Sequence, residues 1–145
     1  MTKKPLKDAV LRRDLAAAHH LSRAFGFDEM VWNHISARIP GTNTFYVTSG
    51  THHFDEVTAA NLVESSSAHA NVTADVIHSA LYNARPDIMA VVHHHTPAVV
   101  AVSMLPEGLK LLSQDAAPFL DRVADPLHLA KRGSGATLVR DVRRD

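Results

Sequence analysis

The sequence predicts an α/β or α+β fold in which helices cover a central sheet. Segments whose apolar residues recur at helical spacing alternate with short segments typical of strands, which is the main reason for this prediction. The chain has 145 residues, a length that fits one domain. No internal repeat is visible, so a repeat architecture is not expected.

The first expected element is a helix over residues 7–25. Its apolar residues recur at intervals of three and four positions, which places them on one side of a helix. Gly26 follows in the position that suits a C-terminal cap. The residues that define the apolar side are Val10, Leu11, Leu15, Ala18, Leu21 and Phe25.

A β-hairpin is expected next, with strands over 31–39 and 44–48 joined by a Gly-Thr-Asn turn. A short helix over 58–63 follows, because Thr58 is a suitable N-cap. Residues 64–71 are polar and rich in Ser and Ala, which predicts a surface loop.

A second long helix is expected to begin at a cap formed by Thr73 or Asp75. It should end before Pro86, because proline disfavours helical geometry at the residue that precedes it. The apolar run at 88–92 is typical of a buried strand. Further elements are expected in chain order as a helix over 96–104, a strand over 108–112 and a helix over 115–123.

The composition excludes several classes of protein. The formal net charge is zero, whereas a nucleic-acid-binding protein needs an excess of basic residues on one face. The chain has no cysteine, so disulfides and thiolate metal sites are excluded. No apolar run reaches the ~18 residues of a membrane span, and the basic N-terminus lacks the apolar core of a secretory signal. We therefore expect a cytoplasmic protein that binds neither nucleic acid nor membranes.

Histidine is the one unusual residue type, with 11 copies in the chain. His93, His94 and His95 come directly after the expected buried strand. In an extended chain residues i and i+2 project to the same face, so His93 and His95 can converge on one ion while His94 points away. Neutral imidazole is a frequent zinc ligand. The spacing alone leaves two alternatives open, a metal site or ordinary surface histidines at the end of a strand.

Several short motifs occur in an order and spacing that resemble the class II aldolase/adducin family. The resemblance covers roughly residues 11–124 and is closest to the adducin-like branch. The similar stretches are VWNHISAR at 31–38, FDEVTAANLV at 54–63, IHSALYNARPD at 77–87, AVVHHHTP at 90–97 and LSQDA at 112–116.

The resemblance implies an αβα three-layer sandwich, often assembled as a homo-oligomer. Classical members bind zinc through a His-x-His pair, here His93 and His95, and a third histidine from a later His-His-Gly strand. They are lyases that act on small hydroxy-carbonyl, sugar-like substrates, and some relatives are epimerases, decarboxylases or dehydratases. In these enzymes zinc polarises the carbonyl. The substrate-binding positions that the resemblance implies are His34, Ser36, Thr48, Ser49 and Gly50.

The chain departs from the family pattern in its catalytic residue and in its third ligand. Counting back from His78, the position of the family's catalytic glutamate is Ala74, which cannot move a proton, so no catalytic residue is assigned. No His-His-Gly follows the zinc motif, and His128 is the only later histidine. We therefore expect a truncated aldolase/adducin-like domain over 1–124 and a divergent, poorly ordered tail over 125–145.

Two functions remain open after this comparison. The histidine pair favours a zinc-dependent lyase or isomerase that acts on a small hydroxy-carbonyl compound. Ala74 and the missing third ligand favour a non-catalytic adducin-like interaction domain or an inactive remnant.

Overall fold

The structure is a computed structural model, and it describes residues 4–119. These residues belong to two compact units that divide between Thr96 and Pro97, and each unit is described by itself. The boundary expected at residue 124 and the tail expected over 125–145 lie outside the described residues.

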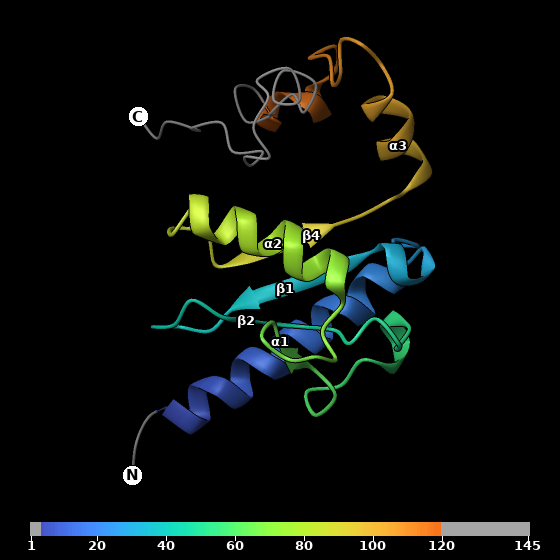
Figure 1. Cartoon of the computed structure of the whole chain (residues 1–145). Helices are drawn as coiled ribbons and strands as arrows, with labels where there is room; N and C mark the ends of the chain where they lie inside the picture. Colours follow the sequence, from blue (N-terminus) through green and yellow to red (C-terminus); the bar gives the residue numbers. More distant parts are fainter. Residues whose placement is uncertain (1–3, 120–145) are drawn as a thin grey trace. The chain divides into compact units, whose positions relative to one another are not determined.

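The first unit is built around a four-stranded antiparallel sheet with the strand order β3-β2-β1-β4. Its two long helices pack on opposite faces of this sheet, so the unit has the three αβα layers that were expected (Figure 1). The elements of the unit are α1 (Lys4–Ala24), β1 (His34–Arg38), β2 (Phe45–Val47), β3 (Val63–Glu64), α2 (Val72–Ala84) and β4 (Ala90–His93).

The central strand β1 faces a different environment on each side. Ile35 and Ala37 belong to an apolar core beneath α1, together with Leu15 of that helix. The alternate residues His34 and Ser36 are also fully buried, but they bond side chains of α2 on the other face. Successive side chains of a strand point to opposite faces, so one short strand supplies both an apolar core and a polar cluster.

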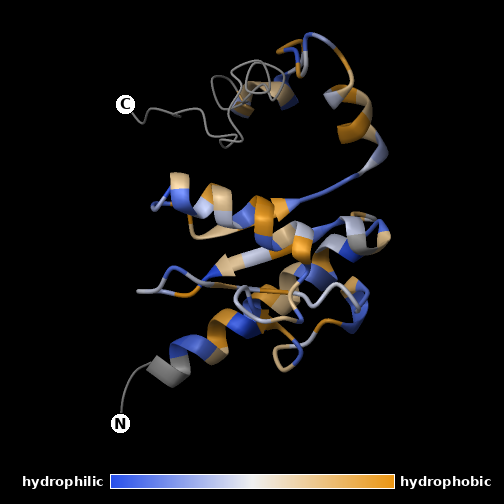
Figure 2. Cartoon of the chain, in the orientation of Figure 1, coloured by the Kyte–Doolittle hydropathy of each residue, from blue (hydrophilic) through white to orange (hydrophobic). Residues whose placement is uncertain are grey.

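The helix α1 ends as the sequence predicted, with a glycine cap after Ala24. Gly26 has a φ of +74°, a left-handed conformation that glycine adopts without steric cost. The N–H of Gly26 donates to the carbonyl of Arg23, and the N–H of Phe27 donates to the carbonyl of Ser22. This pair of bonds is a Schellman motif, which satisfies carbonyls that the end of a helix leaves free. Hydrophilic and hydrophobic residues alternate along this helix (Figure 2).

The expected hairpin is present, but its first strand is shorter than predicted. A short 3₁₀ helix occupies Met30–Trp32, and β1 begins only at His34. The N–H of Trp32 donates to the carbonyl of Glu29 at 3.2 Å, and this tight turn replaces the first two residues of the expected strand. The strands β1 and β2 pair with Ala37 opposite Tyr46, as a hairpin requires.

The short helix predicted over 58–63 is wrong. Residues 54–56 form a 3₁₀ helix instead, and Val63 and Glu64 pair with β2 as strand β3. Between them the N–H of Thr58 donates to the side chain of Asn61, and the N–H of Asn61 donates to the hydroxyl of Thr58. Such local side-chain bonds compete with helix formation.

The second long helix begins earlier than predicted, because its N-cap is Asn71 rather than Thr73 or Asp75. The Asn71 side chain accepts a hydrogen bond from the N–H of Ala74, at 3.1 Å. Asparagine is among the best N-cap residues, and Val72 then becomes the first helical residue.

The strand β4 lies where the sequence predicted a strand, but it is not buried on both faces. It pairs with β1 along one edge, with His34 opposite His93. It is the outer strand of the described sheet, and the apolar residues Met89 and Val92 remain 49% and 55% exposed. The strand predicted from the apolar run is therefore present, but the prediction that it is buried is wrong.

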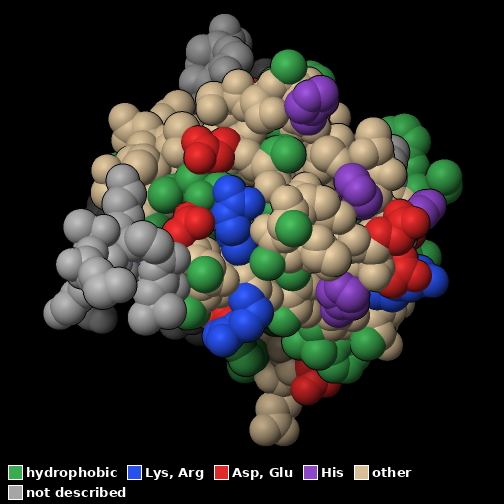
Figure 3. Space-filling model, turned by 90° about the horizontal axis from the view of Figure 1, so that it is seen from below, with side chains coloured by type: hydrophobic (Ala, Val, Ile, Leu, Met, Phe, Trp, Pro, Cys, Tyr) green, Lys and Arg blue, Asp and Glu red, His purple; other side chains and the backbone are tan. Residues whose placement is uncertain are grey.

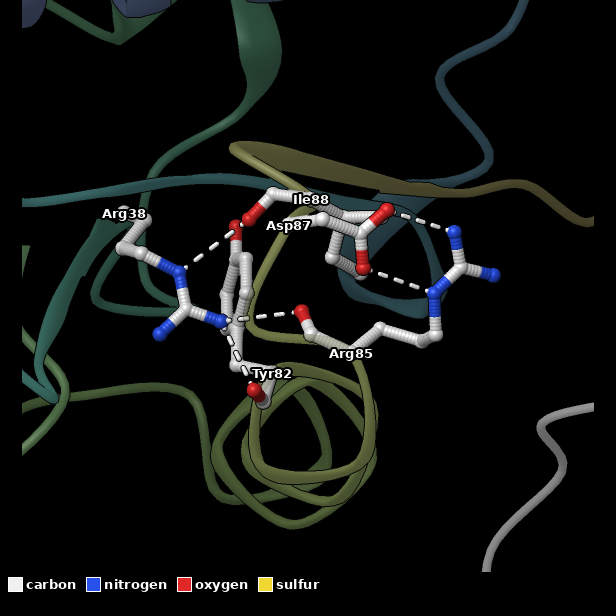
Figure 4. Close-up of polar contacts among 5 residues, drawn as sticks. All are labelled: Arg38, Tyr82, Arg85, Asp87 and Ile88. Atoms are coloured by element: carbon white, nitrogen blue, oxygen red, sulfur yellow. Dashed lines mark hydrogen bonds and ion pairs between the residues drawn. The ribbon is translucent and has the colours of Figure 1, made fainter. Parts of the chain in front are cut away.

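Arg38, at the end of β1, joins the C-terminal end of α2 to the segment that leads into β4 (Figure 4). Its guanidinium donates to the carbonyls of Tyr82, Arg85 and Ile88 at 2.7, 3.3 and 3.1 Å, and it lies over the Tyr82 ring at 4.5 Å. A cation at the C-terminal end of a helix also interacts favourably with the helix dipole. This one side chain therefore fixes where α2 ends against the sheet.

Charged side chains of both signs lie close together on the surface of the described residues. Arg12 pairs with Asp8, and Arg23 pairs with Asp28 and Asp55. On the face that Figure 3 shows, basic side chains lie beside acidic ones.

The described part of the second unit contains the helix α3 (Pro97–Ser103) and a 3₁₀ helix over Gln114–Phe119. The helix predicted over 96–104 is confirmed, and it begins at Pro97, since proline suits the first helical position. The strand predicted over 108–112 is wrong. The N–H of Leu112 bonds the carbonyl of Lys110, so this backbone turns tightly where a strand would be extended. No helix within residues 4–119 is long and apolar enough to span a membrane.

Candidate metal and substrate site

The candidate site lies at one end of the sheet of the first unit. The antiparallel pairing brings the start of β1, the end of β2 and the end of β4 to this end. His34, Thr48 and His93 stand at these three positions. The start of α2 reaches the same end, because the N–H of Asn71 donates to the carbonyl of Thr48 at 3.3 Å.

His93 and His95 converge as the i, i+2 spacing predicted, and we call them the histidine pair. Their Nε2 atoms lie 2.7 Å apart, and their ring centroids lie 4.7 Å apart. His93 is half-buried and His95 is exposed. The backbone of His95 is held in place because its N–H donates to the side-chain oxygen of Asn33, at 2.8 Å.

The histidine pair fits part of a zinc site. Two imidazole Nε2 atoms 2.7 Å apart can share one proton in a hydrogen bond. The same two atoms can also bind one cation together. Tetrahedral zinc at ~2.0–2.1 Å from each nitrogen would place them roughly 3.3 Å apart, so a small side-chain movement suffices. Within residues 4–119, however, no group of three or more histidine, aspartate or glutamate side chains is arranged to hold a metal ion. The later histidine, His128, lies outside the described residues.

His34 connects the histidine pair to a buried group of polar side chains. The His34 ring stacks on the His93 ring, with centroids 4.5 Å apart and an interplanar angle of 13°. The group itself, which we call the buried polar chain, runs from α2 to β1 in the order Tyr82, Ser36, His78, His34.

Short hydrogen bonds hold the buried polar chain together. The hydroxyls of Tyr82 and Ser36 are 2.9 Å apart, and the Ser36 hydroxyl lies 2.6 Å from Nδ1 of His78. Nε2 of His78 then lies 2.8 Å from Nδ1 of His34. The other nitrogen of His34, Nε2, is buried and has no hydrogen-bond partner among the described residues.

Burial keeps these histidines neutral. Loss of solvent, with a smaller contribution from the neighbouring histidines, lowers the pKa of His78 to about 3 and that of His34 to about 4. Burial, followed by the charges of His95 and His94, also lowers the pKa of His93. A histidine binds a metal ion in its neutral form, so these environments favour ligation at neutral pH.

The predicted substrate turn lies beside the N-terminal end of α2. Thr48 is buried, and Ser49 bonds both the Thr51 hydroxyl and Nδ1 of His52, each at 2.8 Å. Gly50 has a φ of +73°, and a Cβ placed there would lie 3.1 Å from the side-chain nitrogen of Asn71. Glycine suits both the left-handed backbone and this close approach, and the turn lies tightly against the helix cap.

Ala74, at the position of the family's glutamate, is completely buried among Phe45, Val47 and Tyr82. Its Cβ therefore faces an apolar core, and the position has no room for a solvated carboxylate. The neighbouring Asp75 accepts a hydrogen bond from Ser79 at 3.3 Å, on another side of the helix. The structure places no acidic side chain at the Ala74 position.

The other histidines differ in their surroundings. His94 turns away from the histidine pair, as predicted, and its ring lies 5.4 Å from that of Phe27. His19 is fully buried in the packing of α1. His78 is a buried, hydrogen-bonded histidine. Its connection to Tyr82 through Ser36 was not predicted from the sequence. The i, i+4 spacing of His78 and Tyr82 on one helix face was the available signal.

Comparisons with known proteins agree with this architecture. The sequence pattern of the family described as Class II Aldolase and Adducin N-terminal domain matches residues 13–141. A Pseudomonas aeruginosa protein whose name places it in aldolase class 2 is 38% identical over 114 residues, which are 72% of this chain and 44% of that protein. Rat alpha-adducin is 35% identical over 121 residues, which are 75% of this chain and 16% of that protein.

A solved structure shares the fold of this chain. L-fuculose 1-phosphate aldolase from Glaciozyma antarctica PI12 superposes with a TM-score of 0.76 at 27% identity, over 86% of this chain and 55% of that one. The chain thus spans about half the length, or less, of these relatives. The αβα layers, the order of the motifs and these matches show that the chain belongs to the class II aldolase and adducin family.

Proposed function

We propose that the histidine pair, His93 and His95, binds a zinc ion and that the domain uses it to act on a small hydroxy-carbonyl, sugar-like compound as a lyase or isomerase. The observation that carries this proposal is the convergence of the two Nε2 atoms at 2.7 Å. The donor type supports it, because neutral imidazole nitrogen is a common zinc ligand. The aldolase in the structural comparison supports the class of substrate.

Each part of the site has a role in this proposal. A zinc ion held by the histidine pair would polarise a substrate carbonyl. His34 and Ser36 line the adjacent strand, and the turn of Thr48, Ser49 and Gly50 supplies hydroxyl groups at the same end of the sheet. The third ligand has to come from outside residues 4–119 or from a second copy of the chain, since homo-oligomers occur in this family. We assign the protein to the cytoplasm, which its lack of cysteine favours.

A specific observation supports a second candidate function, a non-catalytic adducin-like interaction domain. Ala74 is fully buried against Phe45 and Val47, so no proton-transferring carboxylate occupies this position. The likeness to rat alpha-adducin agrees with this alternative. Zinc would then have a structural role or be absent.

Zinc content separates the two functions. We would measure zinc per chain in purified protein by elemental analysis, and compare it with the double variant His93→Ala/His95→Ala. The matched control is His52→Ala/His53→Ala, which removes two other neighbouring histidines. We expect about one zinc per histidine pair, lost in the first variant and kept in the control.

The metal measurement leads to a test of activity. If zinc is present, hydroxy-aldehydes and hydroxy-ketones with and without a phosphate group would be screened for carbon–carbon cleavage and for epimerisation. Zinc without turnover of any compound would support the interaction domain. A folded protein with no zinc, even after incubation with excess metal, would refute the proposed metal site.

A further inference from the structure

His95 lies beyond the end of the sheet. The pairing of β1 with β4 ends where His34 stands opposite His93, so the sheet itself does not extend to His95. The N–H of His95 donates instead to the side-chain oxygen of Asn33, at 2.8 Å. Asn33 directly precedes β1 and is only 2% exposed. A buried side chain therefore continues the attachment between the two strands at the point where the backbone pairing stops.

The orientation of the Asn33 amide group follows from its two partners. A backbone N–H can only donate a hydrogen bond, so the Asn33 atom that faces His95 is the oxygen. The amide nitrogen then faces the carboxylate of Glu29 and donates to its Oε2, at 2.5 Å. An ionised carboxylate only accepts, so each contact joins a donor to an acceptor. Rotation of the amide by 180° would place two donors together at one end and two acceptors together at the other.

A strained turn brings Glu29 to Asn33. Glu29 is the N-cap residue of the short 3₁₀ helix at Met30–Trp32, but its side chain makes no capping hydrogen bond there and bonds Asn33 instead. Met30 has a φ of +49°, which is unfavourable for a residue with a Cβ. Its side chain is 64% exposed, so the packing of Met30 does not account for this conformation. Strained residues of this kind cluster at functional sites.

We propose that Glu29 is a positioning residue of the candidate metal site. Through Asn33, it holds the backbone of His95 in the position from which the histidine pair can bind one metal ion. The metal ion in this proposal rests on the proposed function, whereas the two hydrogen bonds that connect Glu29 to His95 do not.

Anchoring of the backbone is needed more at His95 than at His93. His93 belongs to β4, and its pairing opposite His34 fixes its backbone. His95 has left the sheet, and its side chain is exposed. The two Nε2 atoms lie 2.7 Å apart, and a movement of the His95 backbone would separate them. Residues that orient metal ligands through hydrogen bonds typically raise metal affinity by about 10–100-fold.

The main alternative is that Glu29 binds the metal ion directly. Among residues 4–119, no three or more histidine, aspartate or glutamate side chains are arranged to hold a metal ion, so the carboxylate does not complete a site with the histidine pair. The two roles also make different demands on the side chain. A ligand requires the carboxylate, whereas the bond from Asn33 requires only an oxygen acceptor, which glutamine also has.

Amide hydrogen exchange tests the hydrogen bonds in the absence of metal. We would follow the N–H of His95 by NMR in the full-length, ¹⁵N-labelled protein. We expect it to be protected in the wild-type protein and in Glu29→Gln, and to exchange about tenfold faster in Glu29→Ala. The N–H of Arg38, which donates to the carbonyl of Met89 at the other end of β1, is the internal control and should keep its protection. An unchanged rate at His95 in Glu29→Ala would overturn the proposal.

Zinc affinity tests the consequence for the metal site. We would measure the Kd of zinc by competition with a chromogenic chelator. Glu29→Ala should raise this Kd by about 10–100-fold, and Glu29→Gln should restore most of the wild-type affinity. The matched control is Asp28→Asn, which removes a negative charge from the adjacent residue, whose carboxylate bonds Arg23 instead. This control should leave the Kd of zinc unchanged.

The outcomes separate the possible roles of Glu29. An equal loss of zinc affinity in Glu29→Gln and Glu29→Ala would show that the carboxylate itself is needed, and would overturn the positioning role. An equal loss in Asp28→Asn would reduce the effect to the charge of the segment and would also overturn it. A wild-type protein that binds no zinc would refute the proposed function, and hydrogen exchange would still decide whether Glu29 positions His95.

Discussion

His19 makes the stability of this domain depend on pH. The side chain is completely buried on α1. Its Nδ1 lies 2.8 Å from the carbonyl of Leu15, and its ring meets the Phe54 ring edge-on at 4.7 Å. The second nitrogen, Nε2, is buried without a hydrogen-bond partner among the described residues. A proton added there would create a charge with no acceptor, in an apolar core.

The size of the effect follows from the pKa. Burial lowers the pKa of His19 to about 4 from its ordinary 6.5. Above pH 6.5 both the folded and the unfolded chain hold this histidine neutral, so its environment costs no stability. Between pH 6.5 and 4 only the unfolded chain takes up the proton, and the free energy of unfolding falls by ~1.4 kcal/mol per pH unit. The total loss is about 3 kcal/mol, a large share of the ~5–15 kcal/mol that stabilises a typical domain.

Substitution of His19 by methionine isolates this contribution. Methionine fills a similar apolar space and does not titrate, so His19→Met should reduce the slope of unfolding free energy against pH by about 1.4 kcal/mol per unit between pH 6 and 4.5. We would measure urea unfolding through the fluorescence of Trp32, the only tryptophan. The control is Leu15→Met, in the same core cluster, which should shift stability equally at all pH values. Equal slopes in the wild-type protein and in His19→Met would refute the reasoning.

Three further substitutions test the packing around the site by thermal unfolding. Arg38→Met removes the donor to three carbonyls and should lower the free energy of unfolding by about 2–4 kcal/mol. The control Arg13→Met, on the surface, should lower it by almost nothing. Equal losses of stability in the two variants would contradict the role of Arg38. Gly50→Ala forces a non-glycine residue to a φ of +73° against the cap of α2, at a cost of about 1–2 kcal/mol. Gly41→Ala has a similar φ but no neighbour within 4 Å, and a larger loss there than at Gly50 would contradict the contact. Ala74→Glu places a carboxylate in the apolar core beneath α2 and should cost at least ~3 kcal/mol, and a folded variant of wild-type stability would show that this core is open to solvent.

The sequence predicted the long elements of this fold and missed short ones. The helices α1 and α2 and the strands of the hairpin each carry a periodic pattern over enough residues to be recognised. Residues 58–63 and 108–112 carry only short patterns, and their conformation depends on other parts of the chain. Val63 joins the sheet because β2 is there to pair with it, which no local pattern encodes.

The candidate site was predictable where it depends on neighbouring residues. The convergence of His93 and His95 follows from extended geometry alone, although metal binding by the pair remains a prediction. The buried polar chain was not predictable in this way. Its contact between Ser36 and His78 joins residues 42 positions apart, and it exists only because α2 packs across β1.

The two faces of β1 also help to determine how the strands align. A shift of one residue would turn every side chain of the strand to the opposite face. His34 and Ser36 would then enter the apolar core beneath α1, and Ile35 would replace them beside His78, which would lose its hydrogen bonds. A misaligned pairing of β1 with β2 or β4 would therefore carry both costs, the burial of polar side chains beneath α1 and the loss of the hydrogen bonds of His78. The polar residues of the candidate site therefore also help β1 to pair with its neighbours in the correct register.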